Sequence, residues 1–270
     1  MNQIGIMQGR LIPDENRKIQ SFPRKNWRKE FPLMEKLGLT ILEWTVDHTC
    51  LWDNPILTKN GLLEINQLKD FYKIEILTAT ADNLMQAPIH KSFEGNQTTY
   101  QECVDFLGAL DLAGIKILVW PLIDSGNIAS KTEFEVFQQK MSKICEFLRT
   151  IDIKVAFETD MPPEYNLKLI NSLNSNSIGI NYDIGNSASF GFSVSHEFSV
   201  LKNLIIHLHV KDRIFRGHSV PLGTGDVNWG EVSLELANNY NGIKILQTAR
   251  KQNNLIAIEE YLRFCERIGI

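Results

Sequence analysis

The sequence alternates between short apolar runs and longer amphipathic stretches. Eight runs are short, mostly apolar and often β-branched, at 4–7, 40–44, 74–79, 115–120, 153–157, 178–182, 204–210 and 242–246. Strands that are buried on both faces of a parallel sheet have this composition. The runs therefore predict eight parallel strands.

The stretches between the runs carry apolar residues at three- and four-residue spacing, which is typical of helices that pack on one side. They lie at 27–37, 62–72, 98–113, 133–149, 164–173 and 253–268, with weaker ones at 194–201 and 229–237. Eight strands alternating with about eight helices favour one (β/α)₈ TIM barrel over residues 1–270, a common length for that fold. An open doubly wound sheet is the alternative, but neither a GxGxxG nor a Walker loop is present.

Composition narrows the classes of function. The net charge of -4 gives no reason to expect a nucleic-acid partner, because proteins that bind nucleic acid usually carry a basic face. The four cysteines are far apart and are predicted to be reduced and mostly buried. The first ten residues lack a signal-peptide pattern, and no apolar stretch reaches the roughly 20 residues that cross a bilayer. We therefore expect a cytoplasmic protein with no membrane partner.

Polar side chains stand at the ends of the last four runs, where a barrel of this kind carries its chemistry. They are Glu158, Asp183 with Asn186, His209 and Gln247. Strand geometry directs them toward one axis. Two carboxylates, an imidazole and an amide oxygen form a mixed site for one divalent metal, and they suit Mn²⁺, Mg²⁺ or Co²⁺ better than a thiolate zinc site.

Other residues at the strand ends are predicted to contact a substrate. Glu43 and Asp82 are polar, and Trp44 and Trp120 carry rings that stack on sugars. Four cations could recognise a phosphate or carboxylate, namely Arg10, Lys211, Arg213 and Arg250. Core packing is the alternative for the tryptophans and the favoured interpretation of His207. Loop solvation is the alternative for the cations.

Several segments together resemble one family. They are IMQGRL at 6–11, a QSFP…W…EF stretch at 20–31, FETD at 157–160, NYDIGNSASFG at 181–191, HVKDR at 209–213, VPLGTG at 220–225 and ILQTAR at 245–250. In this order, at strand ends and over the full length, they resemble the xylose isomerase-like barrel superfamily, and within it a branch that opens with IMQGRL. The superfamily includes sugar-phosphate isomerases, ketose 3-epimerases and endonuclease IV.

The resemblance implies a set of site residues. Glu158, Asp183 and His209 match three metal ligands of the isomerases and epimerases, and Gln247 stands where those enzymes have a second glutamate. Mn²⁺ is the first choice of metal, with Mg²⁺, Co²⁺ and Zn²⁺ as alternatives. A substrate-contacting acid is expected at Glu164. Asn186 stands where the family often has a histidine.

The glutamine changes the expected mechanism. Its carbonyl oxygen can bind a metal, but it cannot usefully exchange a proton near neutral pH. Epimerisation by two glutamates is therefore not expected in this form. In one-base chemistry, Glu158 removes a proton next to a carbonyl and the metal stabilises the enediolate. Lys211 or His218 then supplies the second proton.

These observations favour a metal-dependent isomerase or epimerase that acts on a sugar, a sugar phosphate or a sugar acid. A lyase or dehydratase of the same superfamily is one alternative. A non-catalytic sugar-binding barrel is another, because of Gln247. An endonuclease is disfavoured, since six histidines are few for the multi-metal cluster of those enzymes. The expected partner is a small sugar-like molecule, and related barrels also suggest a homodimer.

Overall fold

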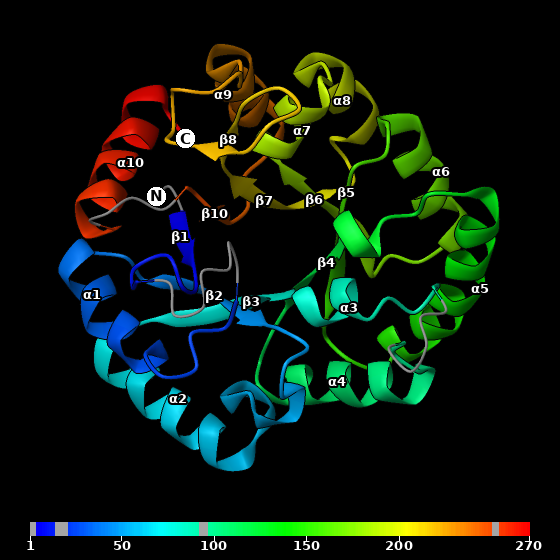
Figure 1. The fold of residues 1–270 in the computed structure, drawn as a ribbon, viewed down its shortest axis with the longest axis horizontal. Helices are drawn as coiled ribbons and strands as arrows, with labels where there is room; N and C mark the ends of the chain where they lie inside the picture. The colour runs from blue at the N-terminus through cyan, green and yellow to red at the C-terminus, as the bar shows by residue number, and fades with distance from the viewer. Residues whose placement is uncertain (1–3, 14–20, 92–96, 250–253) are drawn as a thin grey trace.

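Eight parallel strands close into a barrel in the order β1-β10-β7-β6-β5-β4-β3-β2 (Figure 1). The structure is a computed structural model that describes residues 4–13, 21–91, 97–249 and 254–270. The barrel strands span Ile4–Met7 (β1), Ile41–Val46 (β2), Glu75–Ala81 (β3), Ile117–Leu122 (β4), Lys154–Thr159 (β5), Ile178–Asp183 (β6), Ile205–Val210 (β7) and Lys244–Leu246 (β10). A separate antiparallel pair joins β8 (Asp212–Arg213) to β9 (Ser219–Val220). The predicted barrel is confirmed, with strand ends shifted by one or two residues.

Helices form a ring around the outside of the barrel (Figure 1). The predicted ones are α1 (Glu30–Leu37), α2 (Lys59–Tyr72), α4 (Tyr100–Leu112), α5 (Lys131–Leu148), α6 (Pro163–Leu173), α8 (Val194–Leu201), α9 (Trp229–Asn239) and α10 (Asn254–Ile268). Residue 253, the predicted start of the last helix, lies outside the described residues. Two short helices were not predicted, α3 (Asp82–Gln86) and α7 (Ile184–Phe190).

Aromatic side chains fill the layer between the barrel and its helices. Trp120 on β4 and Phe157 on β5 both pack edge-on against Phe137 of α5, with ring centroids 6.2 and 5.5 Å away. Trp44 on β2 packs against Trp27 at 5.5 Å and donates its indole N–H to Asn54 Oδ1 at 2.9 Å. Burying such side chains stabilises the fold by about 1.5–3 kcal/mol each.

This packing corrects the placement of the two predicted sugar-stacking residues. Trp44 is 0% exposed and Trp120 is 1% exposed. Both side chains lie in the hydrophobic core and not at the open end of the barrel, because successive residues of a strand point to opposite sides of the sheet.

The inside of the barrel holds a cluster of polar side chains. Glu43, Thr80, Asn181 and His207 are each at most 2% exposed, and they contact one another across the barrel. Each is followed two residues later by another buried polar residue, as expected when every second side chain points inward. These buried side chains thus form a hydrogen-bonding cluster inside the barrel, below the ends of the strands.

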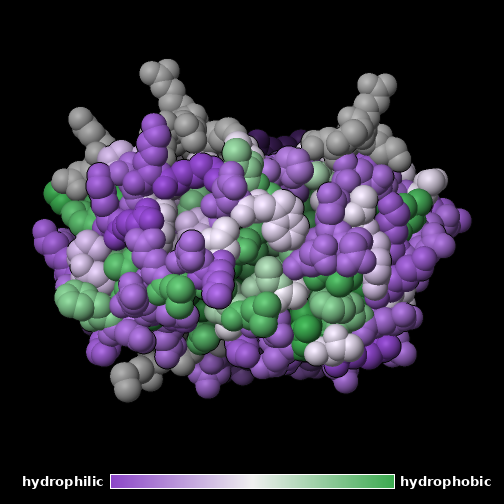
Figure 2. Space-filling model, turned by 90° about the horizontal axis from the view of Figure 1, so that it is seen from below, coloured by the Kyte–Doolittle hydropathy of each residue, from purple (hydrophilic) through white to green (hydrophobic). Residues whose placement is uncertain are grey.

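The outer surface is largely hydrophilic on the side shown in Figure 2, with apolar side chains between the polar ones. Exposed apolar residues include Phe71 on α2 and Leu112 on α4. The predicted homodimer stays a prediction. Of the four cysteines, which are all free, three are buried as expected and Cys50 is exposed. Within the described ranges, no helix combines the length and apolar character needed to span a membrane.

Candidate metal centre

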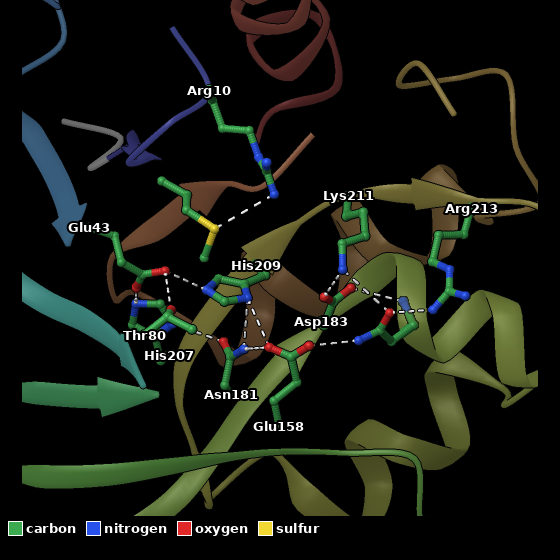
Figure 3. Close-up of polar contacts among 12 residues, drawn as sticks. Arg10, Glu43, Thr80, Glu158, Asn181, Asp183, His207, His209, Lys211 and Arg213 are labelled. Atoms are coloured by element: carbon green, nitrogen blue, oxygen red, sulfur yellow. Dashed lines mark hydrogen bonds and ion pairs between the residues drawn. The ribbon is translucent and has the colours of Figure 1, made fainter. Parts of the chain in front are cut away.

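Three predicted metal ligands converge at the ends of three neighbouring strands. Glu158 on β5, Asp183 on β6 and His209 on β7 each offer a ligand atom, and these atoms lie within 4.8 Å of one another. All three residues are at most 4% exposed. Figure 3 shows the side chains directed toward one another. We call these three residues the ligand triad.

Asp183 connects the triad to helix α7. Its Oδ1 accepts a hydrogen bond from the backbone N–H of Asn186 at 2.8 Å and so caps the N-terminus of the helix. Its Oδ2 accepts a hydrogen bond from Lys211 Nζ at 2.7 Å. Asp183 is therefore held from two sides, which fixes its direction.

Asn186 links the remaining groups. Its Nδ2 donates to Glu158 Oε1 at 2.7 Å. Its Oδ1 accepts from Arg213 Nη1 at 2.7 Å and lies 3.4 Å from Lys211 Nζ. Arg213 also donates from Nε and Nη2 to the carbonyl of Gly217. The predicted site residues Asn186, Lys211 and Arg213 thus form one hydrogen-bonded group around two of the ligands.

Opposite charges on Glu158 and His209 stabilise each other within the triad. Burial alone would raise the pKa of Glu158, but the hydrogen bond and charge of His209 outweigh it and lower the pKa to about 2. Burial would lower the pKa of His209, yet the neighbouring Glu43 and Glu158 raise it to about 10. Glu158 is thus a carboxylate. A metal on His209 would displace its proton, as metal binding to imidazole requires.

The donor set fits a divalent metal. Two carboxylates and an imidazole converge from a rigid sheet, and hydrogen bonds from Asn181, Asn186 and Lys211 orient the two carboxylates. Gln247 follows β10, the next strand around the barrel, and is 5% exposed. Its backbone N–H donates to Val210 O at 3.1 Å, so the residue stands beside the end of β7.

A second group of ligand-type residues lies beneath the triad. Glu43, His207 and His209 also bring ligand atoms within 4.8 Å of one another, and all three are completely buried. We predicted that Glu43 contacts a substrate and favoured core packing for His207. The structure places both inside the barrel, in contact with each other and, for Glu43, with a ligand of the triad.

Two other predicted residues lie close to the open end. Arg10 follows β1, is 4% exposed, and places Nη2 3.7 Å from Met7 Sδ. Figure 3 shows its guanidinium on the same side of the barrel as the triad. Asp82 is buried at the start of α3. Arg250 lies outside the described residues.

Two other predicted residues, Glu164 and His218, are exposed. Glu164 is in the first turn of α6, and its half-exposed carboxylate accepts a hydrogen bond from His196 Nε2 of α8 at 2.6 Å. This contact joins α6 to α8, and the substrate contact that the family resemblance implies for Glu164 stays a prediction. His218 is exposed between β8 and β9, where its carbonyl accepts from Ile214 N–H at 3.2 Å.

Two residues of the site were not predicted, Asn181 and Asp212. Asn181 lies two residues before Asp183 and so shares its inward face, a signal that the strand period provides. Asp212 is completely buried, and its Oδ2 accepts hydrogen bonds from the backbone N–H groups of Gly223 and Gly225 at 2.8 and 3.0 Å. A Cβ on Gly225 would lie 2.2 Å from Asp212 Oδ1, which explains the second glycine in the VPLGTG segment.

A cavity beside the triad continues under α7 to Tyr182, Ser187 and Glu197. Glu197 on α8 is 6% exposed, and its Oε2 accepts hydrogen bonds from the hydroxyls of Tyr182, at 2.9 Å, and Ser187. Burial raises the pKa of Glu197 to about 7, although both hydroxyls act in the opposite direction. This carboxyl is therefore protonated far more readily than an exposed glutamate.

Solved structures with similar folds cover nearly the whole chain. They include D-psicose 3-epimerase with D-tagatose from Clostridium cellulolyticum H10 (14% identity, TM-score 0.75, 98% of this chain and 99% of that one). The 3-keto-D-glucoside 4-epimerase of E. coli has 14% identity and a TM-score of 0.74, over 99% and 100% of the two chains. The IOLI protein with a zinc atom has 13% identity and a TM-score of 0.74, over 99% and 96%.

At these identities the likeness establishes the fold. No curated protein matches the sequence. The family model described as xylose isomerase-like TIM barrel matches residues 31–268, which include the whole ligand triad. The chain therefore belongs to the xylose isomerase-like TIM-barrel family.

Proposed function

We propose that the protein is a divalent-metal-dependent isomerase or epimerase that acts on a small sugar, sugar phosphate or sugar acid. The observation that carries this proposal is the convergence of Glu158, Asp183 and His209 at the ends of neighbouring strands. Sugar epimerases and a zinc-containing protein among the similar structures support it. Mn²⁺ is the proposed metal.

Glu158 is the proposed base. Its carboxylate is ionised, and Asn181 and Asn186 each donate a hydrogen bond to one of its oxygens, at 2.9 and 2.7 Å. It removes a proton from the carbon next to the substrate carbonyl. The metal, when bound at the triad, supplies Lewis-acid stabilisation for the negative charge that develops on the substrate oxygen.

The return of the proton decides between isomerisation and epimerisation. Gln247 cannot exchange protons usefully near neutral pH, so it cannot replace a second glutamate in that role. Glu158 can return the proton to the adjacent carbon on the same face, which isomerises an aldose and a ketose. Lys211, whose side chain is 12% exposed beside Asp183, can protonate from a different direction, which inverts a centre.

The cations of the site favour a substrate that carries a negative charge. Lys211 and Arg213 lie around Asn186, and Arg10 lies across the barrel end (Figure 3). Guanidinium groups bind carboxylates and phosphates in pairs of parallel hydrogen bonds. A sugar acid or sugar phosphate is therefore the preferred class within the proposal.

Metal content and proton exchange together test the function. The wild type should bind one Mn²⁺ per chain, and Asp183→Asn, which keeps a side chain able to cap α7, should bind it weakly or not at all. The loaded protein would then be incubated in D₂O with aldoses, ketoses, sugar acids and their phosphates. Metal-dependent deuterium incorporation next to a carbonyl supports the proposal. Stoichiometric metal with no exchange in any substrate class would contradict it.

A further inference from the structure

Glu43 contacts the ring of His209 on the side opposite the proposed metal. Glu43 Oε1 lies 2.7 Å from His209 Nε2, and His209 Nδ1 lies 3.1 Å from Glu158 Oε2. Figure 3 shows the imidazole lying between the two carboxylates. Nδ1 is thus the nitrogen on the triad side, and Nε2 is the nitrogen that faces the barrel interior.

The hydrogen-bond network assigns the direction of each contact. Asn181 Nδ2 lies 2.9 Å from Glu158 Oε2, which can only accept, so this atom is the amide donor. The same Nδ2 lies 3.0 Å from His209 Nδ1, which also lies 3.1 Å from Glu158 Oε2 and donates to it while His209 is protonated. Metal binding removes that proton and leaves a lone pair on Nδ1. The ring proton of a neutral His209 is then on Nε2, where Glu43 accepts it.

Glu43 is itself fixed by two other side chains. Thr80 Oγ1 donates to Glu43 Oε1 at 2.9 Å. His207 Nε2 lies 2.9 Å from Glu43 Oε2, close but not aligned as a hydrogen bond, and its Nδ1 lies 2.8 Å from Asn181 Oδ1. The rings of His207 and His209 are nearly perpendicular, with centroids 5.2 Å apart. All these residues are at most 2% exposed, so water does not compete for the contacts.

We propose that Glu43 is a positioning residue of the metal centre, which holds His209 in the tautomer and orientation that present Nδ1 to the metal. The proposal rests on the metal centre of the proposed function. Carboxylates that accept the second N–H of a metal-bound histidine raise its basicity and fix its ring. Glu43 acts through His209 and from the interior, although it lies three strands away around the barrel.

Glu43→Gln tests this role directly. The amide has nearly the shape of the carboxylate, but it offers only one acceptor oxygen and loses the charge. We expect the Kd for Mn²⁺ to rise roughly 10- to 100-fold at unchanged stoichiometry. In the ¹⁵N-histidine spectrum of the Zn²⁺-loaded protein, the wild type should show the His209 proton on Nε2, and the variant should show a weakened or mixed tautomer.

A milder pair of variants serves if Glu43→Gln does not fold. Thr80→Val removes the hydroxyl that fixes Glu43, and we expect it to weaken Mn²⁺ binding several-fold. Thr78→Val is the matched control, because Thr78 is equally buried and lies two residues earlier on the same strand. We expect it to bind Mn²⁺ like the wild type.

Each contrary outcome has its own meaning. Wild-type affinity and tautomer in both Glu43→Gln and Thr80→Val would overturn the positioning role and leave the proposed function standing. Two metal ions per wild-type chain, reduced to one in Glu43→Gln, would instead make Glu43, His207 and His209 a second metal site and would also overturn it. No metal in the wild type would overturn both the metal centre and this inference.

Discussion

The ammonium nitrogen of Lys211 lies 2.7 Å from Asp183 Oδ2, so a cation of the protein itself contacts a proposed metal ligand. Gly185 makes this arrangement possible. A Cβ at position 185 would lie 2.9 Å from Lys211 Cγ, and the helix start could not approach the lysine so closely. The site therefore combines the ligand triad with a positive charge that would act against metal binding.

Removing that charge should strengthen metal binding. Two unit charges a few ångströms apart interact by roughly 1–4 kcal/mol, depending on the effective dielectric constant. We expect Lys211→Met to lower the Kd for Mn²⁺ by about tenfold in a calorimetric titration. Catalysis should fall in the same variant if Lys211 returns the proton.

Lys211→Arg is the control, since it keeps a positive charge at the position. It should bind Mn²⁺ with nearly wild-type affinity. Weaker Mn²⁺ binding in Lys211→Met would mean that the lysine mainly holds Asp183 in place.

The buried carboxyl of Glu197 should make stability depend on pH. Its pKa is raised from 4.5 to about 7, so the folded state favours the protonated form. This contribution is fully present below about pH 4.5 and is lost as the pH rises through 7. A shift of this size corresponds to about 3 kcal/mol. Between pH 4.5 and 8 the wild type should therefore lose about 3 kcal/mol of unfolding free energy relative to Glu197→Gln.

Urea unfolding of both proteins at several pH values measures this difference. Glu146→Gln, on the exposed face of α5, is the matched control and should follow the wild type. A constant difference between the wild type and Glu197→Gln across the range would contradict the assignment.

Asp212 should be essential for the loop that follows β9. Its carboxylate accepts the N–H groups of Gly223 and Gly225 and also lies 3.3 Å from the indole nitrogen of Trp229. In Asp212→Asn, one accepting oxygen becomes a donor that faces other donors. We expect a loss of about 2–4 kcal/mol of unfolding free energy, with faster hydrogen exchange at residues 223–227.

The neighbouring Asp226→Asn provides the comparison. Asp226 is exposed and accepts one backbone N–H, from Phe215 at 2.7 Å. The Asp226→Asn substitution should lower the unfolding free energy by less than about 1 kcal/mol. Equal effects of the two substitutions would show that Asp212 has no special role.

Trp44 should affect stability and not metal binding. Trp44→Phe removes the N–H that Asn54 Oδ1 accepts within the core, where both residues are 0% exposed. We expect a loss of about 1–3 kcal/mol of unfolding free energy. The Kd for Mn²⁺ should stay unchanged. A weaker metal centre in a fully folded variant would argue against this placement of Trp44.

The sequence pattern predicts the strands well because a parallel barrel needs apolar side chains on both faces of the sheet. The short helices α3 and α7 could not be found in this way. Each begins directly at a strand end, and α7 depends on the Asp183 cap, a local hydrogen bond that leaves no periodicity. Tertiary contacts determine these elements more than the apolar pattern does.

In the candidate site, too, some residues follow from the strand pattern and others depend on tertiary contacts. Glu158, Asp183 and His209 stand at strand ends on the inward face, so the barrel model brings them together. Glu43 and Trp44 end the predicted strand at 40–44, but β2 continues to Val46. Neighbouring residues of a strand point to opposite sides, and the pattern alone does not say which side each takes. The hydrogen-bond partner of Glu164, His196, depends on how α6 meets α8, which no local pattern encodes.

The anchoring of the loop after β9 by Asp212 has a consequence for protein engineering. The hairpin before it is also tied down through main-chain groups, since the N–H groups of Ile214 and Arg216 bind the carbonyls of His218 and Ser189. Main-chain contacts of this kind survive a change of side chain. The exposed positions 214, 216 and 218 are therefore suited to a combinatorial library, in which new selectivity is sought beside an intact ligand triad.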